Sequence, residues 1–580
     1  MSKLNVDQKT IFNLLSDKKA DFLIPDYQRP YAWDEEQCQT LWDDVFLFSF
    51  PNNNYEEFDD NEEYFLGAIV TYKNENGKSE VIDGQQRLTT LMLILRAFYD
   101  KFANMQDKNS ILTRERVEKC IWKTDTFGTA DRNTLKIDSE VATDNDKEEF
   151  LELLRTGSVN FDSKSQYVLN YKFFQNRIDD FLQGFPSFFP YLPARILGNC
   201  ILLPIEAESQ DTALRIFSTL NDRGLPLSDA DIFKAQFYKY YGDLNKKDDF
   251  INEWKGLEEI TSSIFDPKTG TPMDELFTRY MYFLRAKERN KSTTTESLRK
   301  FYERNKYQYL KRDNTIDELK ALALFWQSVY KQDKKRFSDD ILKKLFVLNY
   351  APNGMWQNIT SVYFLKNKSD EGELSKSKFK DFLNKITVFI FAYAVTNPGV
   401  NALRTPIFDE MINVIDGKKV TFSKYKFNDS SIRASFENYV FTNQRSITRS
   451  MITWYAFFFL EQQLLDIGEI FHLEHIYAKK CYEMKGGLQD KNNLESLGNK
   501  ILLEGSINIK ASDYRFEDKK KIYSGEQRRG NNKELSKIAE IANIVDYNEF
   551  KEEQIINRNK AILEKFFDFL RSEELVVIQD

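Results

Sequence analysis

The segments FHLEHIYAKK (471–480) and LGNKILLEGSINIKASDYRFEDK (497–519) decide how the C-terminal part of the chain folds. The 580 residues contain two histidines, His472 and His475, and both lie in the first segment, so chemistry that needs an imidazole is expected here. Neutral imidazole is a good general base near neutral pH. Adjacent strand residues point to opposite faces, but at a strand end or bulge Glu474 and His475 can both reach one metal-bound phosphate.

Two asparagines in the second segment extend this constellation. Asn499 follows a glycine, and Asn508 lies nine residues further along a polar, helix-compatible run. An amide oxygen is a hard ligand for Mg²⁺, as is the carboxylate of Glu474, and an asparagine can also hold a loop by hydrogen bonding. One carboxylate, one base and two amides predict a one-metal phosphodiesterase site.

The order E-H-I, G-N-K-I-L-L and a second asparagine resembles the HNH (ββα-metal) nucleases, above all the HNH domain at the C-terminus of GmrSD-type, type IV restriction enzymes. The resemblance implies that His475 is the general base and that Glu474 and Asn508 bind Mg²⁺ or another divalent cation. It also implies that Asn499 orients the base or its loop. The alternative is that both histidines are structural, and His472 is interpreted as structural or at most as an auxiliary phosphate contact.

Further positions in this region match the family or depart from it. Phe516 and Lys519 match an F-x-x-K that closes the family motif, whereas Ala478 stands where the family usually has proline. The spacer between the histidine and the first asparagine is also long, which concerns the shape of the loop. Lys519 and Lys520 belong to a segment rich in Lys and Arg (479–533) that is predicted to contact DNA; the alternative is an ordinary solvated helix face.

A second motif, Asp83-Gly84-Gln85-Gln86-Arg87, joins a predicted strand (79–84) to a strongly apolar helix. Helix N-termini attract phosphate, glycine permits close approach, and Arg87 can clamp oxygens with two hydrogen bonds. Asp83 is a candidate to hold Mg²⁺ or polarise a water that Gln86 positions. The alternative is a buried pair of Arg87 and Asp83 that ties the helix to the sheet.

IPDYQRPYAW (24–33), a strand pair and DGQQRLTT together resemble the N-terminal domain of the same GmrSD-type enzymes. That domain is similar to the ParB/sulfiredoxin fold and binds and hydrolyses nucleoside triphosphate in the family. No Walker A pattern is present. Arg223 and Asp229, in a further family-like segment, either face the nucleotide or take part in helix capping, with Ser228 as the predicted N-cap of the second helix. The nucleotide-binding residues implied by the resemblance are Gln28, Arg29, Asp83, Gly84, Gln85, Gln86 and Arg87, with Asp83, Gln86 and Arg87 catalytic.

Length and composition predict an α+β, predominantly helical protein with several domains. We expect a ParB/sulfiredoxin-like domain over 1–240 with a helical insertion at about 101–200, a helical linker or sensor over 241–440, and an HNH domain over 441–580. The four separated cysteines fit reduced thiols. The N-terminus lacks an apolar h-region, and the apolar run 451–460 is too short to span a bilayer and is predicted to form a core helix. A cytoplasmic location without membrane contact is therefore expected.

Together with the resemblance, these observations predict an NTP-regulated, Mg²⁺-dependent, modification- or phage-directed DNA endonuclease of anti-phage defence. It is expected to nick or cut DNA, with modified phage DNA as the substrate that the resemblance implies, and to have an associated NTPase activity. Its expected partners are DNA and nucleoside triphosphate, and a homo-oligomer is compatible with the sequence. A net charge of −8 argues against a surface coated for bulk nucleic-acid binding. Two alternatives stay open: a nucleotide-dependent defence switch with an inactive nuclease domain, and an indiscriminate, toxin-like DNase or RNase.

Overall fold

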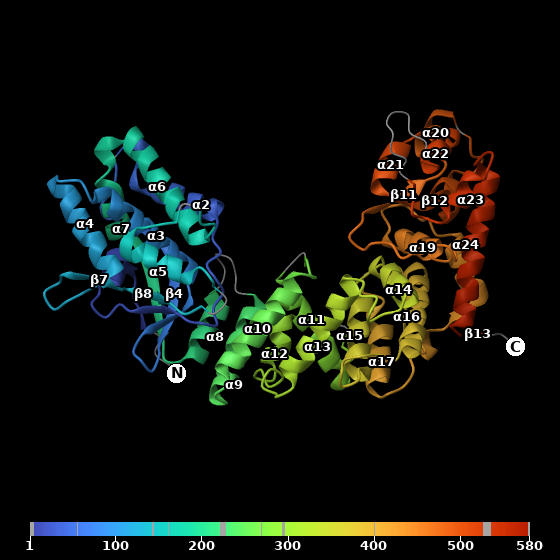
Figure 1. Ribbon diagram of the computed structural model, residues 1–580, viewed down its shortest axis with the longest axis horizontal. Coiled ribbons are helices and arrows are strands. Elements are labelled where there is room, and N and C mark those ends of the chain that lie inside the picture. The colour runs from blue at the N-terminus through green and yellow to red at the C-terminus, as the bar shows by residue number, and fades with distance from the viewer. Residues whose placement is uncertain are drawn as a thin grey trace. The chain divides into compact units, whose positions relative to one another are not determined.

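The computed structural model describes residues 5–54, 56–141, 144–160, 162–220, 228–267, 270–292, 296–399, 401–485, 487–525 and 535–577. The chain forms two compact units, Met1–Lys255 and Gly256–Asp580 (Figure 1). The predicted division at 440/441 falls inside the second unit. Most residues are helical and the sheets are small, as predicted for an α+β chain.

The first unit is built on a seven-stranded mixed sheet in the order β1-β9-β4-β5-β3-β8, with β2 also paired to β9. β4 runs parallel to β9 and antiparallel to β5, and β3 runs parallel to both β5 and β8. β6 and β7 form a separate antiparallel ribbon. The strands are β1 Asn5–Val6, β2 Lys9–Thr10, β3 Phe22–Ile24, β4 Tyr64–Lys73, β5 Ser79–Asp83, β6 Trp122–Thr124, β7 Ala130–Leu135, β8 Ile137–Ser139 and β9 Cys200–Ala207.

Helices pack against this sheet around two hydrophobic cores. The larger core contains α3, which carries buried apolar residues around its whole circumference, as is typical of an interior helix. The smaller core lies where α8 and α9 pack with residues of β4, β5 and β9. The helices of this unit are α1 Ile11–Leu15, α2 Glu35–Ser49, η1 Pro51–Asn53, α3 Gln85–Phe102, α4 Lys108–Ile121, α5 Lys147–Thr156, α6 Gln166–Gly184, η2 Pro186–Phe188, α7 Tyr191–Asn199, α8 Gln210–Leu220 and α9 Asp229–Asp243; α10 Lys247–Ser262 crosses the division.

The second unit begins with a stack of helices, which confirms the amphipathic pattern predicted for this region. Its aromatic residues mostly fill the core; Phe301 and Tyr302, for example, are fully buried. The helices are α11 Pro272–Lys287, α12 Leu298–Glu303, α13 Thr315–Tyr330, α14 Asp339–Asn349, α15 Met355–Asn367, α16 Lys376–Thr396, α17 Arg404–Ile415, η3 Ser423–Tyr425, α18 Asp429–Glu437 and α19 Ser446–Ala456.

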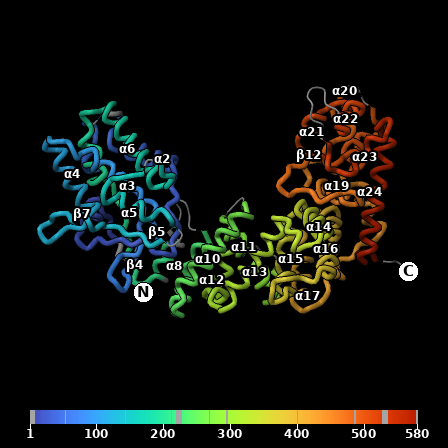
Figure 2. The backbone as a smooth tube through the Cα atoms, viewed as in Figure 1, coloured from blue at the N-terminus to red at the C-terminus, as the bar shows by residue number. Residues whose placement is uncertain are grey.

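The C-terminal part of this unit contains a two-stranded sheet followed by a helix. The long helix α24 packs against η5 and beside α16, so the end of the chain returns onto the segment that contains β11 and β12 (Figure 2). The elements are β10 Phe427–Asn428, β11 Phe471–His475, α20 Lys479–Lys485, η4 Lys491–Glu495, η5 Leu497–Asn499, β12 Lys500–Glu504, α21 Gly505–Ala511, α22 Phe516–Tyr523, α23 Ile541–Val545, α24 Glu552–Ser572 and β13 Val576–Val577.

Two local expectations differ from the structure. The segment 101–200, predicted to be helical, also contributes β6, β7 and β8, and β8 joins the main sheet by pairing with β3. The apolar run 451–460 is helical only to Ala456, and Phe458 and Leu460 beyond it are 48% and 94% exposed. Among the described residues, no helix is long and apolar enough to cross a membrane.

Candidate active site

The segments 471–480 and 497–519 form a strand–strand–helix unit. β11 and β12 pair antiparallel without a bulge, and the register places His475 opposite Lys500. α21, which carries Asn508, follows β12 directly and packs against both strands. The ββα order implied by the resemblance is therefore present.

His475, the last residue of β11, contacts an ion pair. The ammonium group of Lys500 lies 2.9 Å from Nε2 of His475 and donates to Oε2 of Glu495 at 2.7 Å and to Oδ1 of Asn443 at 2.6 Å. Burial raises the pKa of Glu495, but the hydrogen bonds from His475 and Lys500 outweigh this effect and lower the pKa to about 2. Burial lowers the pKa of Lys500, against the effect of Glu495. Glu495 is therefore ionised at neutral pH and fixes both neighbours.

Glu474 has a different set of partners from His475, because β11 continues without a bulge to its end. Lys519 donates to Oε1 of Glu474 at 2.5 Å and to the carbonyl oxygen of His475 at 2.6 Å, and the hydroxyl of Tyr523 donates to the same Oε1 at 3.0 Å. Lys519 is 1% exposed. Its predicted contact with DNA is therefore incorrect, since a buried ammonium group that is bonded to Glu474 cannot also reach a phosphate backbone. Lys520 donates to the carbonyl oxygen of Tyr547 at 3.0 Å.

The two predicted asparagines differ in their surroundings. Asn499 is fully buried; its amide nitrogen donates to the carbonyl oxygens of Tyr477 and Leu494 at 3.1 and 3.0 Å, and its oxygen accepts from Tyr477 N at 2.7 Å. Asn499 therefore shapes the loop after His475, and backbone groups of that loop engage both polar groups of its side chain. Asn508 differs, because its Oδ1 is buried and has no hydrogen-bond partner among the described residues.

The helix α24 packs against the Gly498-Asn499 turn and fixes its backbone. A side chain at Gly498 would meet the carbonyl oxygen of Ile555 at 2.0 Å, so only glycine fits. Arg558 donates to the carbonyl oxygens of Leu497, Gly498 and Lys500 at 2.7–3.0 Å. Sequence reasoning missed Arg558, Lys500, Glu495 and Asn443, whose roles depend on contacts between distant segments. Tyr523 had a local signal, since it stands four residues after Lys519 on a helix.

The Asp83–Arg87 motif occupies the junction of β5 and α3. Gly84 has φ +87°, and a Cβ there would lie 2.9 Å from the carbonyl oxygen of Ala68, so glycine is required on both counts. Arg87 donates to that same carbonyl oxygen at 2.7 Å and lies across Gly67, where a Cβ would meet its guanidinium at 2.7 Å. The helix has no side-chain cap at its N-terminus.

Asp83 lies among partly buried charges. Burial raises the pKa of its carboxyl, while the N–H of Gly84 and the charges of Arg87 and Arg29 act against that rise. Burial also lowers the pKa of Arg87. Burial therefore disfavours both charges, while the mutual attraction of Asp83 and Arg87 acts against that effect, so the two groups form an oppositely charged pair in a site with reduced solvation.

The glutamines of the motifs hold the chain rather than face a ligand. Gln86 accepts from the backbone N–H groups of Ala32 and Trp33 at 2.7 and 3.2 Å and donates to Pro30 O at 3.1 Å. Gln28 is buried and donates to Ile82 O at 3.2 Å. Backbone groups thus occupy the amide groups predicted to position a water or bind nucleotide, and these two residues tie the motifs together. Gln85 is buried at the first position of α3.

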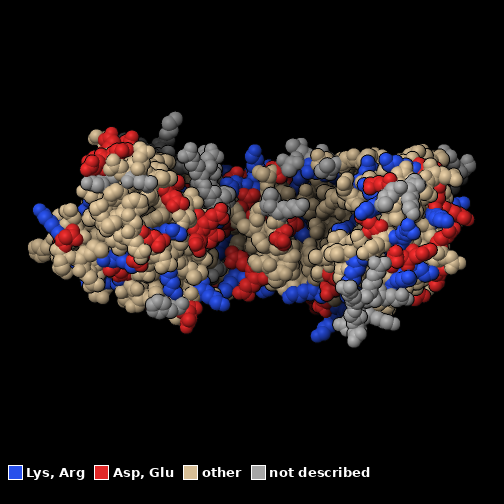
Figure 3. All heavy atoms as spheres, turned by 90° about the horizontal axis from the view of Figure 1, so that it is seen from above, with Lys and Arg blue, Asp and Glu red and all other residues tan. Residues whose placement is uncertain are grey.

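The remaining predicted positions either cap a helix or lie outside the described residues. Ser228 caps α9 through Asp231 N, which confirms the predicted helix start, and Asp229 lies in the first turn. Arg223, and the basic pair Arg528 and Arg529, lie outside the described residues. On the face shown in Figure 3, Lys and Arg are intermingled with Asp and Glu in each unit.

Two family models match the chain. The model described as "GmrSD restriction endonuclease, N-terminal domain" matches residues 11–238. The model described as "GmrSD restriction endonucleases, C-terminal domain" matches residues 417–565. Among curated proteins, no match to the chain was found.

Proposed function

Because the chain belongs to the GmrSD restriction endonucleases, type IV restriction enzymes of defence systems, we propose that it is an NTP-regulated nuclease that nicks or cuts modified phage DNA at the ββα unit. The observation that carries this proposal is the junction of β11, β12 and α21. It brings one general-base candidate, one held carboxylate and one buried amide oxygen without a described partner into a single small unit.

The donor set suits a hard divalent cation such as Mg²⁺. The unpartnered Oδ1 of Asn508 and the carboxylate of Glu474 are oxygen ligands, and both contacts to Glu474 from Lys519 and Tyr523 are made by Oε1. Among the described residues no group of three or more His, Cys, Asp and Glu could hold a metal, so Glu474 and Asn508 would hold it together with waters. When bound, the cation supplies charge stabilisation to the phosphorane.

His475 would accept the proton of the attacking water. When Nε2 accepts from the ammonium group of Lys500, the ring proton is on Nδ1 and Nε2 is the basic nitrogen; once protonated, Nε2 would instead donate to Oε2 of Glu495, which lies 3.5 Å away. The water that His475 deprotonates has to take the place of this Lys500 contact. Lys519 holds the carbonyl of His475, and Asn499 holds the loop that follows, so the imidazole is supported on both sides of its Cα.

The β5–α3 junction would hold the triphosphate. Arg87, Arg29 and the uncapped N-terminus of α3 would bind phosphate oxygens, and Asp83 would bind a cation or polarise a water. Gly67 leaves room for the guanidinium group of Arg87, and Gly84 permits the close approach of the β4 backbone at Ala68. Gln28 and Gln86 would act by keeping the two motifs in register.

The Lys500 contact favours a second candidate, a nucleotide-dependent switch whose nuclease site is inactive. A basic nitrogen that accepts a hydrogen bond from an ammonium group is not free to take a proton from water. Under this alternative the chain would hydrolyse NTP and act through a partner.

Cleavage assays with purified protein separate these functions. Plasmid DNA, unmodified and from modified phage, is incubated with Mg²⁺ and with or without each NTP. We expect modification-dependent nicking that disappears in His475→Ala and persists in His472→Ala, a matched control on the other histidine of β11. Cutting retained by His475→Ala would overturn the site, no cutting with NTP hydrolysis retained would support the switch, and equal cleavage of host DNA or RNA would indicate an indiscriminate nuclease.

A further inference from the structure

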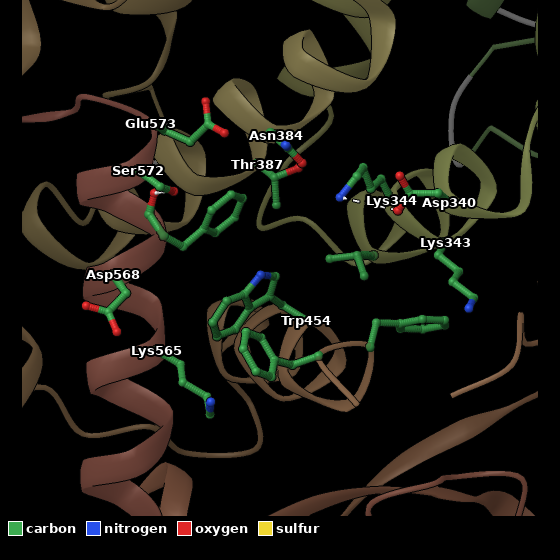
Figure 4. Close-up of a pocket in the computed structure, with 14 residues that line it drawn as sticks. Asp340, Lys343, Lys344, Asn384, Thr387, Trp454, Lys565, Asp568, Ser572 and Glu573 are labelled. Atoms are coloured by element: carbon green, nitrogen blue, oxygen red, sulfur yellow. Dashed lines mark hydrogen bonds and ion pairs between the residues drawn. The ribbon is translucent and has the colours of Figure 1, made fainter. Parts of the chain in front are cut away.

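A cavity of about 510 Å³ lies in the second unit between α14, α16, α19 and α24 (Figure 4). Its residues are separate from those of the ββα site and from the β5–α3 junction. Cavities of about 300–1,000 Å³ are typical of small-molecule sites. α19 and α24 also support the nuclease strands, because they pack against β12 and η5 respectively.

One wall of the cavity is aromatic. Trp454 of α19 stacks on Phe569 of α24 with ring centroids 5.9 Å apart and planes 6° apart. Phe457 and Phe458 follow Trp454 and also line the cavity, and Phe458 is 48% exposed. Aromatic wall residues provide flat surfaces on which a base can stack, an interaction worth about 1–3 kcal/mol per base.

The cavity also has uncompensated positive charge. Lys344 and Lys565 approach it from opposite walls (Figure 4). Lys565 lies 4.0 Å from the ring centroid of Phe458, and Lys344 has its carboxylate contact, to Asp340, at 3.8 Å. Among the described residues, neither Lys343 nor Lys565 makes an ion pair. Burial lowers the pKa of Lys344, with the charges of Asp340 and Glu573 acting against this effect and that of Lys380 acting with it.

The carboxylates that line the cavity do not balance these lysines, since each is closer to another basic group. The pairs are Asp340 with Lys380 at 2.6 Å, Asp568 with Arg571 at 2.6 Å, and Glu573 with Lys385 at 3.5 Å. An anion in the cavity would therefore meet a surplus of ammonium groups.

Asn384 of α16 adds a directional polar group. Its Oδ1 is buried and has no hydrogen-bond partner among the described residues. A buried acceptor without a partner costs free energy, which a ligand N–H group would recover. A ring or exocyclic N–H of a nucleobase is such a donor.

We propose that this cavity binds a nucleotide, with the base on the aromatic wall of Trp454 and Phe458, an N–H of the base on Asn384, and the phosphate between Lys344 and Lys565. The nucleotide is either free or part of a DNA strand, since both present the same base and phosphate. This site is additional to the proposed triphosphate site of the first unit. Photocrosslinking to the cavity does not require DNA cleavage, so nucleotide binding there and the proposed nuclease activity can be refuted independently.

Photocrosslinking of the full chain tests the site with two probes, free 5-iodo-dUMP and a short single-stranded oligonucleotide with one 5-iodo-dU. Irradiation couples the base to a nearby aromatic residue, and mass spectrometry identifies the peptide. We expect adducts on the peptide of Trp454–Phe458 or that of Phe569, reduced at least ten-fold by Lys344→Gln combined with Lys565→Gln. Lys376→Gln, an exposed lysine at the start of α16, is the matched control and should leave the adducts unchanged.

The two arms identify the source of the nucleotide. Adducts with the mononucleotide indicate a free nucleotide as the ligand, and adducts with the oligonucleotide alone indicate a base of the DNA strand. Thermal melting verifies that the variants fold. Adducts on other peptides only, or adducts at the cavity that the double variant leaves unchanged, would overturn the proposal. As a second variant, Asn384→Ala should weaken the adducts of the wild-type cavity without removing its charge.

Discussion

Replacement of Glu495 by glutamine tests the charge arrangement around His475. Glu495 has a side chain that is 23% exposed, and its pKa is lowered from 4.5 to about 2. Because one pKa unit corresponds to about 1.36 kcal/mol, the ionised form contributes at most about 3–4 kcal/mol to folding. The amide of glutamine still offers an oxygen to Lys500, so we expect Glu495→Gln to lower the unfolding free energy by about 1–3 kcal/mol at pH 7.

The pH dependence gives this prediction its sign. A carboxylate whose pKa is lower in the folded state stabilises above its unfolded pKa, 4.5 here, and loses this effect as pH falls toward the folded pKa of about 2. The difference between wild type and Glu495→Gln should therefore be constant from pH 7 to about pH 5 and fall to less than half near about pH 3.

Urea unfolding followed by hydrogen exchange of peptides from β11 and β12 measures this difference locally. Glu517→Gln, at an exposed position of α22 in the same unit, is the matched control and should change stability by less than about 0.5 kcal/mol. A difference below about 0.5 kcal/mol for Glu495→Gln at pH 7, or one that does not shrink toward low pH, would refute the proposed role of the ion pair.

Three further substitutions test the proposed sites. His475→Ala should lower the rate of DNA cleavage by about 100- to 10,000-fold in a plasmid assay while NTP hydrolysis continues, because only a general base is removed; unchanged cleavage would contradict this. Asn508→Ala should raise the Mg²⁺ concentration needed for half-maximal cleavage by about ten-fold or more, measured by titration, and an unchanged Mg²⁺ requirement would remove Asn508 from the metal site. Arg87→Ala should weaken NTP binding by about 10- to 100-fold through loss of charged hydrogen bonds, measured by calorimetry, and a wild-type affinity would exclude it from the nucleotide site.

Much of the fold near both sites could be predicted because its signals are local. The strand before Asp83, the glycine at the turn and the apolar helix after it are readable from consecutive residues, as is the capped start of α9 at Ser228. β8 could not be predicted, because three residues of a polar stretch become a strand only through pairing with β3. The end of α19 was also misjudged, since exposed aromatic residues continue the apolar run beyond the helix.

In the candidate nuclease site, local signals were again sufficient for some residues only. Glu474, His475 and Asn508 were predicted from a sequence motif, whereas the partners of His475 could not be predicted. Asn443 and Lys500 are far apart in sequence and meet only when α19 and the nuclease strands pack. Lys519 was misassigned because a lysine in a basic segment usually faces solvent, and nothing local indicates that its ammonium group pairs with a buried carboxylate.

The carboxylate of Glu474 holds α22 through the buried contact with Lys519, and in the proposed site the same carboxylate would also bind the cation. Because the charge of Glu474 holds α22, the proposed divalent ion would weaken this contact when it binds, and displacement of α22 would leave the charge of Glu474 uncompensated and more attractive to the ion. Such linkage is reciprocal. A DNA strand that displaced α22 would therefore change the metal affinity of the proposed site without contacting the metal.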